Sequence, residues 1–194
     1  ARDRAFGFYY PDDLAALESA GAELVFFDTL RDTQLPPALD GLVIGGGFPE
    51  TCLAALEANV ALRAQLRAAI EAGLPTYAEC GGLMYLSRSI AWQAQRAQMV
   101  GAIPVDAVMH ERPVGRGYVE LRASGASPWT GAAGTIVRGH EFHHSSLENL
   151  PPGQRYAWLV QRGHGIDGRN DGLLLHNLVA SYSHLRQGAG SAWA

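Results

Sequence analysis

Cys80 is the residue whose surroundings point most directly to chemistry. It follows an apolar stretch that begins at Leu74, with Ala78 two residues before it and Gly82 two residues after it. Small residues at those two positions are what a sharp strand-to-helix turn requires, as in the G-x-S-x-G pattern. Such a turn places the sulfur beside a helix N-terminus, whose dipole favours a thiolate. We therefore predict a nucleophilic cysteine, and a small buried apolar side chain is the alternative left open.

A thiolate that attacks an acyl group needs backbone donors aimed at the developing oxyanion. Gly45, Gly46 and Gly47 follow the buried stretch 41–44, so they are expected at the end of a neighbouring strand. We predict that the backbone N–H groups of Gly46, Gly47 and Gly81 form an oxyanion hole. A plain turn that needs glycine at positive φ would explain the same triplet.

One of seven histidines is expected to act as the general base. His184 follows a short strand candidate, residues 178–183, that delivers it to a sheet edge. Neighbouring residues on a strand point to opposite faces, so the histidines around position 142 are not expected to bind a metal. We expect a supporting or substrate-contacting role for this group, which comprises His140, Glu141, Phe142 and His143.

The elements that position these residues alternate between strand and helix in the first half of the chain. Asn59 is expected to interrupt the longest helical stretch and to cap its second part. The order β-α-β-α-β-α predicts a parallel sheet with helices on both faces and a site at the carboxyl ends of its strands. The expected elements are a strand around Phe6, a helix over 11–21, strands over 23–27 and 41–44, a helix over 53–70, a strand over 74–79 and a helix after Cys80.

The second half of the chain is predicted to be mostly β. Its strand candidates are residues 99–104, 117–121, 135–142, 156–160 and 173–175. The fold class is therefore α/β, with a parallel or mixed sheet, flanking helices and added strands.

Length and composition describe one globular domain over residues 1–194. A net charge of −4, with the arginines scattered, gives no nucleic-acid footprint. We also expect no membrane span and a cytoplasmic location, because no apolar run is long enough to cross a bilayer and two cysteines offer no disulfide framework. Because the chain opens at Ala1 without an initiator Met, we expect it to be a piece of a longer polypeptide.

Five motifs together give the chain a family resemblance over nearly its whole length. They are Ala1–Leu14, Gly45–Glu50, Tyr77–Tyr85, Gly139–His143 and Ala180–His184. With these motifs the chain resembles the C-terminal class I glutamine amidotransferase domains of cobyrinic acid a,c-diamide synthases. That resemblance implies a flavodoxin-like core to which strands have been added.

The resemblance also implies a reaction and its partners. Cys80 attacks the side-chain amide of L-glutamine, a glutamyl thioester forms, and His184 protonates the departing nitrogen and then activates water. Ammonia passes to an ATP-dependent synthetase domain that amidates the a and c carboxylates of a tetrapyrrole in cobalamin biosynthesis. The chain has no phosphate-binding P-loop motif, so no cofactor is expected in this domain and the sites for ATP and Mg²⁺ are expected in the synthetase domain.

One position departs from the wider class, in which a Glu commonly lies two residues after the catalytic His. Here that position is Arg186, and a cation cannot orient an imidazole as a carboxylate does. Glu141 is one candidate to replace it, and a thiolate that needs no carboxylate is the other. Two further alternatives stay open: the same module serving cobyric acid or a nickel tetrapyrrole, and a binding or regulatory module that has lost turnover.

Overall fold

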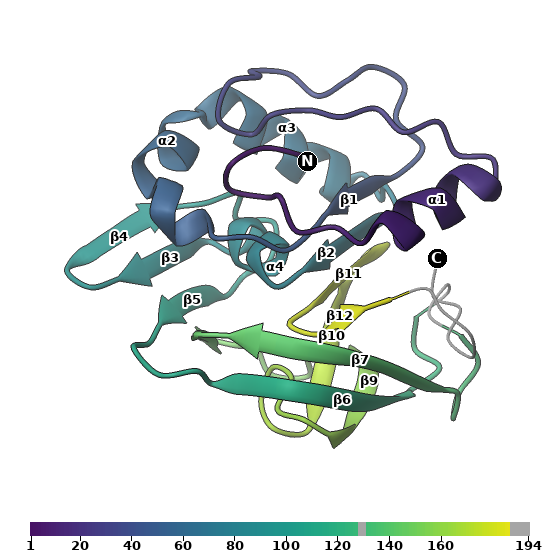
Figure 1. Ribbon diagram of the computed structural model, residues 1–194. Helices are drawn as coiled ribbons and strands as arrows, with labels where there is room; N and C mark the ends of the chain where they lie inside the picture. The colour runs from purple at the N-terminus through teal and green to yellow at the C-terminus, as the bar shows by residue number, and fades with distance from the viewer. Residues whose placement is uncertain (128–130, 187–194) are drawn as a thin grey trace.

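The computed structural model describes residues 1–127 and 131–186 (Figure 1). In Figure 1, α2 and α3 lie at the top, α1 lies to the right of β1, and the long strands β6 and β7 lie at the bottom. α4 sits beside the end of β2, between the helices α2 and α3 and the long strands. The helical elements are α1 (Pro11–Ser19), η1 (Pro49–Cys52), α2 (Leu53–Ala58), α3 (Val60–Glu71) and α4 (Gly81–Leu86).

A mixed sheet forms the centre of the molecule. Its parallel pairs are β1 with β2 and β2 with β11, whereas its other pairs are antiparallel. In spatial order its strands are β1 (Leu42–Ile44), β2 (Thr76–Glu79), β11 (Leu178–Ser181), β10 (Asn170–Leu175), β9 (Tyr156–Arg162), β6 (Gly115–Ala123), β7 (Ile136–His143) and β12 (His184–Leu185). Only the first part of this sheet therefore has the parallel pairing that the alternation of strand and helix predicts.

The sheet curls, so that its far end returns to its parallel part. β12 is the last strand beyond β7, yet the backbone N–H of Leu185 donates to Oε1 of Glu79 at the end of β2, at 3.0 Å. This contact brings the carboxyl end of a parallel strand next to a strand from the antiparallel half of the sheet.

A second, smaller sheet flanks α4. Its strands, in spatial order, are β4 (Gln95–Gln98), β3 (Ser89–Trp92), β5 (Asp106–Met109) and β8 (Ser145–Glu148). β8 begins two residues after the end of β7, so this sheet places residues 143–145 beside α4 and β5.

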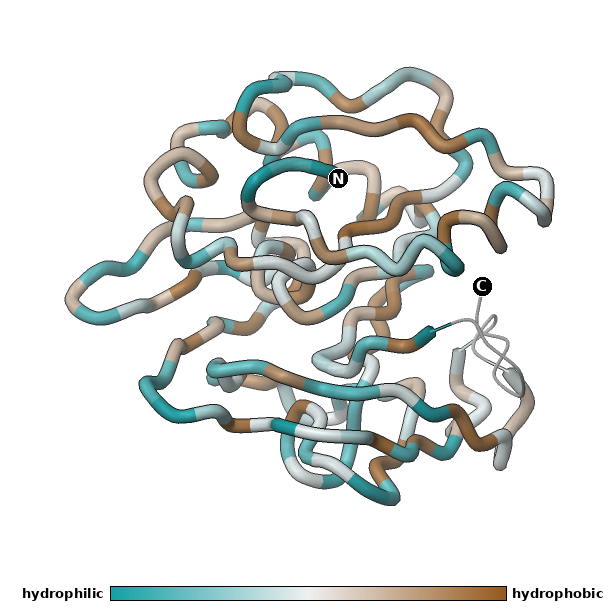
Figure 2. The backbone as a smooth tube through the Cα atoms, viewed as in Figure 1, coloured by the Kyte–Doolittle hydropathy of each residue, from teal (hydrophilic) through white to brown (hydrophobic). Residues whose placement is uncertain are grey.

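The core has two parts, one between the helices and the sheet and one inside the curl. α3 contributes Leu62, Leu66 and Ile70 to the first part, at a spacing of four that places all three fully buried on one face. Trp158 and Leu121 lie in the second part. Each such buried side chain contributes about 1.5–3 kcal/mol. In Figure 2 the tube is hydrophobic at β1 and hydrophilic at the tip of the β3–β4 hairpin.

The predicted fold class and most first-half elements are confirmed. The helix expected over 11–21 is α1, and the break at Asn59 separates α2 from α3. Asn59 caps α3 through Oδ1, which accepts from the N–H of Leu62, while its amide nitrogen donates to the carbonyl of Thr29 at 2.9 Å.

Three predicted strands are wrong. Residues 23–27 are extended but unpaired: Val25 is 52% and Phe26 47% exposed, and Arg2 supplies a single backbone bond to the carbonyl of Phe27. Around Phe6 the chain is irregular, with one bridge farther on, between Phe8 and Gly46. The two segments lie against each other and against β1 but form no ladder of backbone hydrogen bonds. High β-propensity is therefore not enough to make them strands.

Residues 99–104 form the third wrong strand. Gly101 has φ 71°, and the N–H groups of Met99, Val100 and Ile103 donate to carbonyls in and just after α4. The segment therefore wraps the end of a helix, and its apolar residues are buried there rather than in a sheet.

None of the helices in the described ranges is long and apolar enough to cross a membrane.

Candidate active site

Cys80 lies at the turn between β2 and α4, as predicted. Its φ of 48° and ψ of −99° are strained for a residue with a side chain. The conformation is held because its N–H donates to the carbonyl of Ser181 at 2.7 Å and its carbonyl accepts from the N–H of Met84 at 3.1 Å. The side chain is 7% exposed and lines a cavity, so the turn presents the sulfur to a space large enough for a small molecule.

The glycines around Cys80 let two backbone segments approach each other. A Cβ on Gly81 would lie 2.9 Å from the carbonyl oxygen of Gly47, and one on Gly82 would collide with the carbonyl oxygen of Ile44. The N–H of Gly81 is in the first turn of α4, where no intrahelical acceptor exists. No described residue accepts a hydrogen bond from the N–H of Gly47. Two backbone donors thus lie free beside Cys80.

His184 reaches the site from the opposite end of the sheet. It opens β12, is 5% exposed, and is in register with His140 on β7. Its Nδ1 lies 3.2 Å from Oε2 of Glu79, which leaves Nε2 for a second partner. A Cβ on Gly46 would lie 2.5 Å from Cε1 of His184, so glycine at position 46 makes room for the imidazole.

Glu79 is the carboxylate that orients this histidine. Its Oε1 accepts from the hydroxyl of Tyr77 at 2.7 Å and from the N–H of Leu185 at 3.0 Å, while Oε2 faces His184. The carboxylate is buried and its acceptor positions are occupied, so it has little freedom to turn away.

The charge state of His184 follows from these neighbours. Burial, the largest influence, lowers its pKa, but hydrogen bonds and negative charge from Cys80 and Glu79 outweigh it and raise the pKa of His184 to about 10. The imidazole therefore carries a proton at neutral pH, between a sulfur and a carboxylate.

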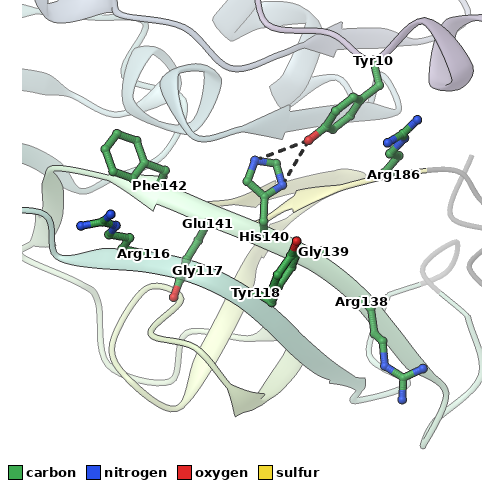
Figure 3. Close-up of a pocket in the computed structure, with 10 residues that line it drawn as sticks. All are labelled: Tyr10, Arg116, Gly117, Tyr118, Arg138, Gly139, His140, Glu141, Phe142 and Arg186. Atoms are coloured by element: carbon green, nitrogen blue, oxygen red, sulfur yellow. Dashed lines mark hydrogen bonds between the residues drawn. The ribbon is translucent and has the colours of Figure 1, made fainter.

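Sequence reasoning missed Glu79 and considered Glu141 for the same task. The Glu141 carboxylate instead accepts from the N–H groups of His164 and Gly165, at 2.7 and 2.9 Å, and lies 3.6 Å from Nε2 of His143. Figure 3 shows why it does not reach His184: Glu141 and His140 project from opposite sides of β7. The available signal was the position of Glu79, directly before the cysteine at the end of a buried strand.

The other histidines on β7 surround the site in different ways. His140 stacks on His184 with ring centroids 5.0 Å apart, and the hydroxyl of Tyr10 lies 3.2 Å from its Nδ1. Burial, and then the charge of His184, lower the pKa of His140. His143 is buried and stacks on Tyr182 at 3.9 Å. His140 therefore lies against His184, and His143 lines the same cavity as Cys80.

Arg186 points away from this group. Its guanidinium lies 2.6 Å from the carboxylate of Asp12 and over the ring of Tyr10. Arg186 is thus a surface residue that ties the C-terminal strand to α1.

Two cavities flank the site. One, of about 350 Å³, is lined by Cys80 together with Glu50, Met84, Trp92, Glu111 and His144. The other, of about 630 Å³, lies on the far side of His140 and is lined by Tyr10, Arg116, Tyr118, Arg138, His140 and Arg186 (Figure 3). Phe142, which is 51% exposed, lines both. We call the first the inner cavity and the second the outer cavity.

No group of three or more His, Cys, Asp or Glu side chains in residues 1–127 and 131–186 is arranged to hold a metal ion.

Comparison with known proteins adds a family to this geometry. The family of CobB/CobQ-like glutamine amidotransferase domains matches residues 1–190. The cobyrinate a,c-diamide synthase of Magnetococcus marinus is 46% identical over 194 residues, which are all of this chain and 41% of that protein. The synthase of the same name from Archaeoglobus fulgidus is 44% identical over 95% of this chain and 39% of its own length. The chain thus spans about two fifths of these relatives.

Solved structures support the fold. A glutamine amidotransferase from Thermotoga maritima has a TM-score of 0.61 at 13% identity and covers 89% of this chain and 68% of its own. One from Methylobacillus flagellatus has a TM-score of 0.52 at 17% identity and covers 89% of this chain and 64% of its own.

Proposed function

Because the chain belongs to the CobB/CobQ-like glutamine amidotransferase family, we propose that its site hydrolyses L-glutamine to glutamate and ammonia. The observation that carries the proposal is the arrangement of Cys80, His184 and Glu79 in space. The strained cysteine contacts the imidazole, and the imidazole contacts the carboxylate that orients it. A module that had lost turnover would have no need to maintain the strained φ of Cys80.

In the first half of the reaction, the Cys80 thiolate attacks the amide carbon of glutamine and a C–S bond forms. The carbonyl electron pair moves onto oxygen, where the N–H groups of Gly47 and Gly81 donate to it. We place the N–H of Gly46 in the same group; the Cα of Gly46 faces the ring of His184, where a Cβ would collide with it. His184 then gives its proton to the amide nitrogen, the C–N bond breaks, and ammonia leaves a glutamyl thioester.

In the second half, His184 is neutral and takes a proton from water. The hydroxide attacks the thioester carbon, the C–S bond breaks, and glutamate and the Cys80 thiolate are released. The Glu79 carboxylate stabilises the imidazolium in both halves and fixes the tautomer that directs Nε2 to the sulfur.

We further propose that the ammonia serves an ATP-dependent synthetase domain that amidates the a and c carboxylates of cobyrinic or hydrogenobyrinic acid in cobalamin biosynthesis. The name shared by the relatives supports this, and so does the three fifths of their length that this chain does not match. ATP and Mg²⁺ would then act in that domain, with no cofactor in this one, and residues 1–194 would be a single glutaminase domain. Two free cysteines and ATP-dependent chemistry favour the cytoplasm.

We propose that the face of the molecule on which the outer cavity opens is the one that contacts the synthetase domain. Tyr118 is 76% and Phe142 51% exposed there, on adjacent strands that line the cavity (Figure 3). Exposed aromatic side chains beside a reactive site are typical of interfaces. His140 connects this cavity to His184, so ammonia released at Cys80 would have a short way to it.

The test compares nitrogen sources in the complete synthase. Cys80→Ser and His184→Asn should abolish glutamine-dependent amidation of cobyrinic acid and retain amidation with added ammonium salt. Loss of both activities would mean that these residues are structural, and retention of glutamine-dependent synthesis by Cys80→Ser would refute the proposed nucleophile. Amidation of cobyric acid or a nickel tetrapyrrole in place of cobyrinic acid would change the acceptor and leave the glutaminase reaction intact.

A further inference from the structure

Glu50 is a half-buried carboxylate whose hydrogen-bond donor within the described residues is its own backbone N–H. It lies in η1, three residues after Gly47, and lines the inner cavity together with Cys80. Burial raises the pKa of Glu50, while a hydrogen bond from its own backbone N–H and the charge of His144 act in the opposite direction. In residues 1–127 and 131–186, no other residue donates a hydrogen bond to this carboxylate or forms an ion pair with it.

Other carboxylates withdrawn from solvent in this protein are satisfied. Glu79 and Glu141 each accept from two or more donors, as described above. Asp171 accepts from the N–H groups of Tyr182 and Ser183. A carboxylate withdrawn from water costs stability unless enough donors or a cation bind it, so the remaining acceptor sites of Glu50 favour a ligand.

The size of the inner cavity and the groups in its wall indicate which ligand fits. It has about 350 Å³, the nucleophile in its wall, and a negative group in the same wall. A substrate that presents an acyl carbon to Cys80 and a cation to Glu50 satisfies both. An L-amino acid with an amide side chain has that form, since its α-ammonium is its single cation.

We propose that Glu50 binds the α-ammonium group of L-glutamine and thereby selects a free amino acid over simple amides. This inference rests on the proposed glutaminase function and adds the residue that determines substrate specificity. Glu111 also lines the inner cavity, but its side chain is exposed to solvent, so its charge is screened and it serves as the matched control.

The experiment compares two alkylating agents at the same sulfur in the complete synthase. 6-Diazo-5-oxo-L-norleucine carries an α-ammonium group, whereas iodoacetamide carries none. The rate of adduct formation at Cys80 is followed by peptide mass for the wild type, Glu50→Gln and Glu111→Gln. We expect Glu50→Gln to slow the diazo compound about 10- to 100-fold and to change the iodoacetamide rate less than about threefold, with Glu111→Gln close to wild type for both.

Three results would overturn the assignment. Equal slowing of both reagents would mean that Glu50 acts on the sulfur or on folding, and no slowing of either would mean that it does not touch the ammonium. A selective effect in Glu111→Gln instead would transfer the role to that residue. Failure of the proposed function itself looks different, because the wild-type protein would then form no adduct with the diazo compound at all.

Discussion

The Glu79 carboxylate lies 3.2 Å from Nδ1 of His184, a residue 105 positions later in the chain. Glu79 also precedes Cys80 directly in the chain. The end of one strand therefore carries both the proposed nucleophile and the carboxylate beside its proposed acid–base partner. With Glu79 beside His184, the role expected of a carboxylate at position 186 is already filled, and Arg186 pairs with Asp12 instead. The curled sheet is what makes the contact between Glu79 and His184 possible, because it returns β12 to the end of β2.

Glu79→Gln should lower kcat for glutamine hydrolysis about 10- to 100-fold with little change in KM. The amide keeps the shape of the side chain but cannot stabilise the imidazolium, and a thiolate depends less on this than a serine would. Steady-state glutaminase assays measure the effect. Glu141→Gln is the matched control and should retain the wild-type rate within about threefold; the reverse pattern would assign the orienting role to Glu141.

The stability of the protein should depend on pH through His184. Its pKa in the folded state, about 10, lies above its ordinary value, so the stabilisation is fully present below about pH 6.5 and is lost as the pH rises toward 10. Because Glu79 contributes to that shift, the excess stability of the wild type over Glu79→Gln should shrink between pH 6.5 and 10. Urea denaturation at several pH values measures it, and a difference that stayed constant or grew would contradict the assigned charge state.

Gly46→Ala should displace the imidazole. Its Cβ would lie 2.5 Å from Cε1 of His184, closer than real contacts allow, so kcat/KM should fall about 100-fold. Gly41→Ala is the control, because its Cβ would meet only the carbonyl of Pro75, at an ordinary 3.6 Å. Equal activity of the two variants in the glutaminase assay would mean that His184 has room to move.

Asp171→Ala should destabilise the segment that leads into His184. The buried carboxylate accepts from the N–H groups of Tyr182 and Ser183 and from the hydroxyl of Ser183, at 2.6 Å. Leaving these donors unpaired should cost about 3 kcal/mol or more, against about 1 kcal/mol for Ser183→Ala. Urea denaturation measures both, and a loss below 1 kcal/mol for Asp171→Ala would show that water satisfies the donors.

Tyr118→Ser should uncouple the two reactions of the complete synthase. Tyr118 lines the outer cavity, where it is exposed, and not the inner cavity that contains Cys80. Glutamate formation should therefore continue while less amide product is made per glutamate. The ratio of the two products measures this, with ammonium-dependent synthesis as the control. A ratio equal to that of the wild type would remove the outer cavity from the proposed interface.

Short-range rules determine the strand-to-helix turn at Cys80, helix α1 and the break at Asn59, so the sequence predicts all three, and the α/β fold class with added strands follows from the order of such elements. Cys80 is framed by Ala78 and Gly82, and Asn59 caps the helix that starts beside it. Residues 23–27 misled the same reasoning, since their apolar side chains have strand propensity but find no ladder partner in this fold.

The pairing of Glu79 with His184 was not accessible, because it depends on how far the sheet curls. Neither residue's neighbours in the chain indicate that β12 returns to β2 across the whole width of the sheet. Alternation along a strand means that only one of His140 and Glu141 can face His184. Which of the two does so depends on the register that pairs His184 with His140, and the sequence does not reveal that register.

The most direct test of the account is intact-mass analysis after treatment with 6-diazo-5-oxo-L-norleucine, on the wild type and on Cys80→Ser in the complete synthase. We predict one adduct per wild-type chain, mapped to Cys80, and none on Cys80→Ser. An unmodified wild-type protein, or an adduct that persists in Cys80→Ser, would contradict the claim that Cys80 is a nucleophile that recognises glutamine.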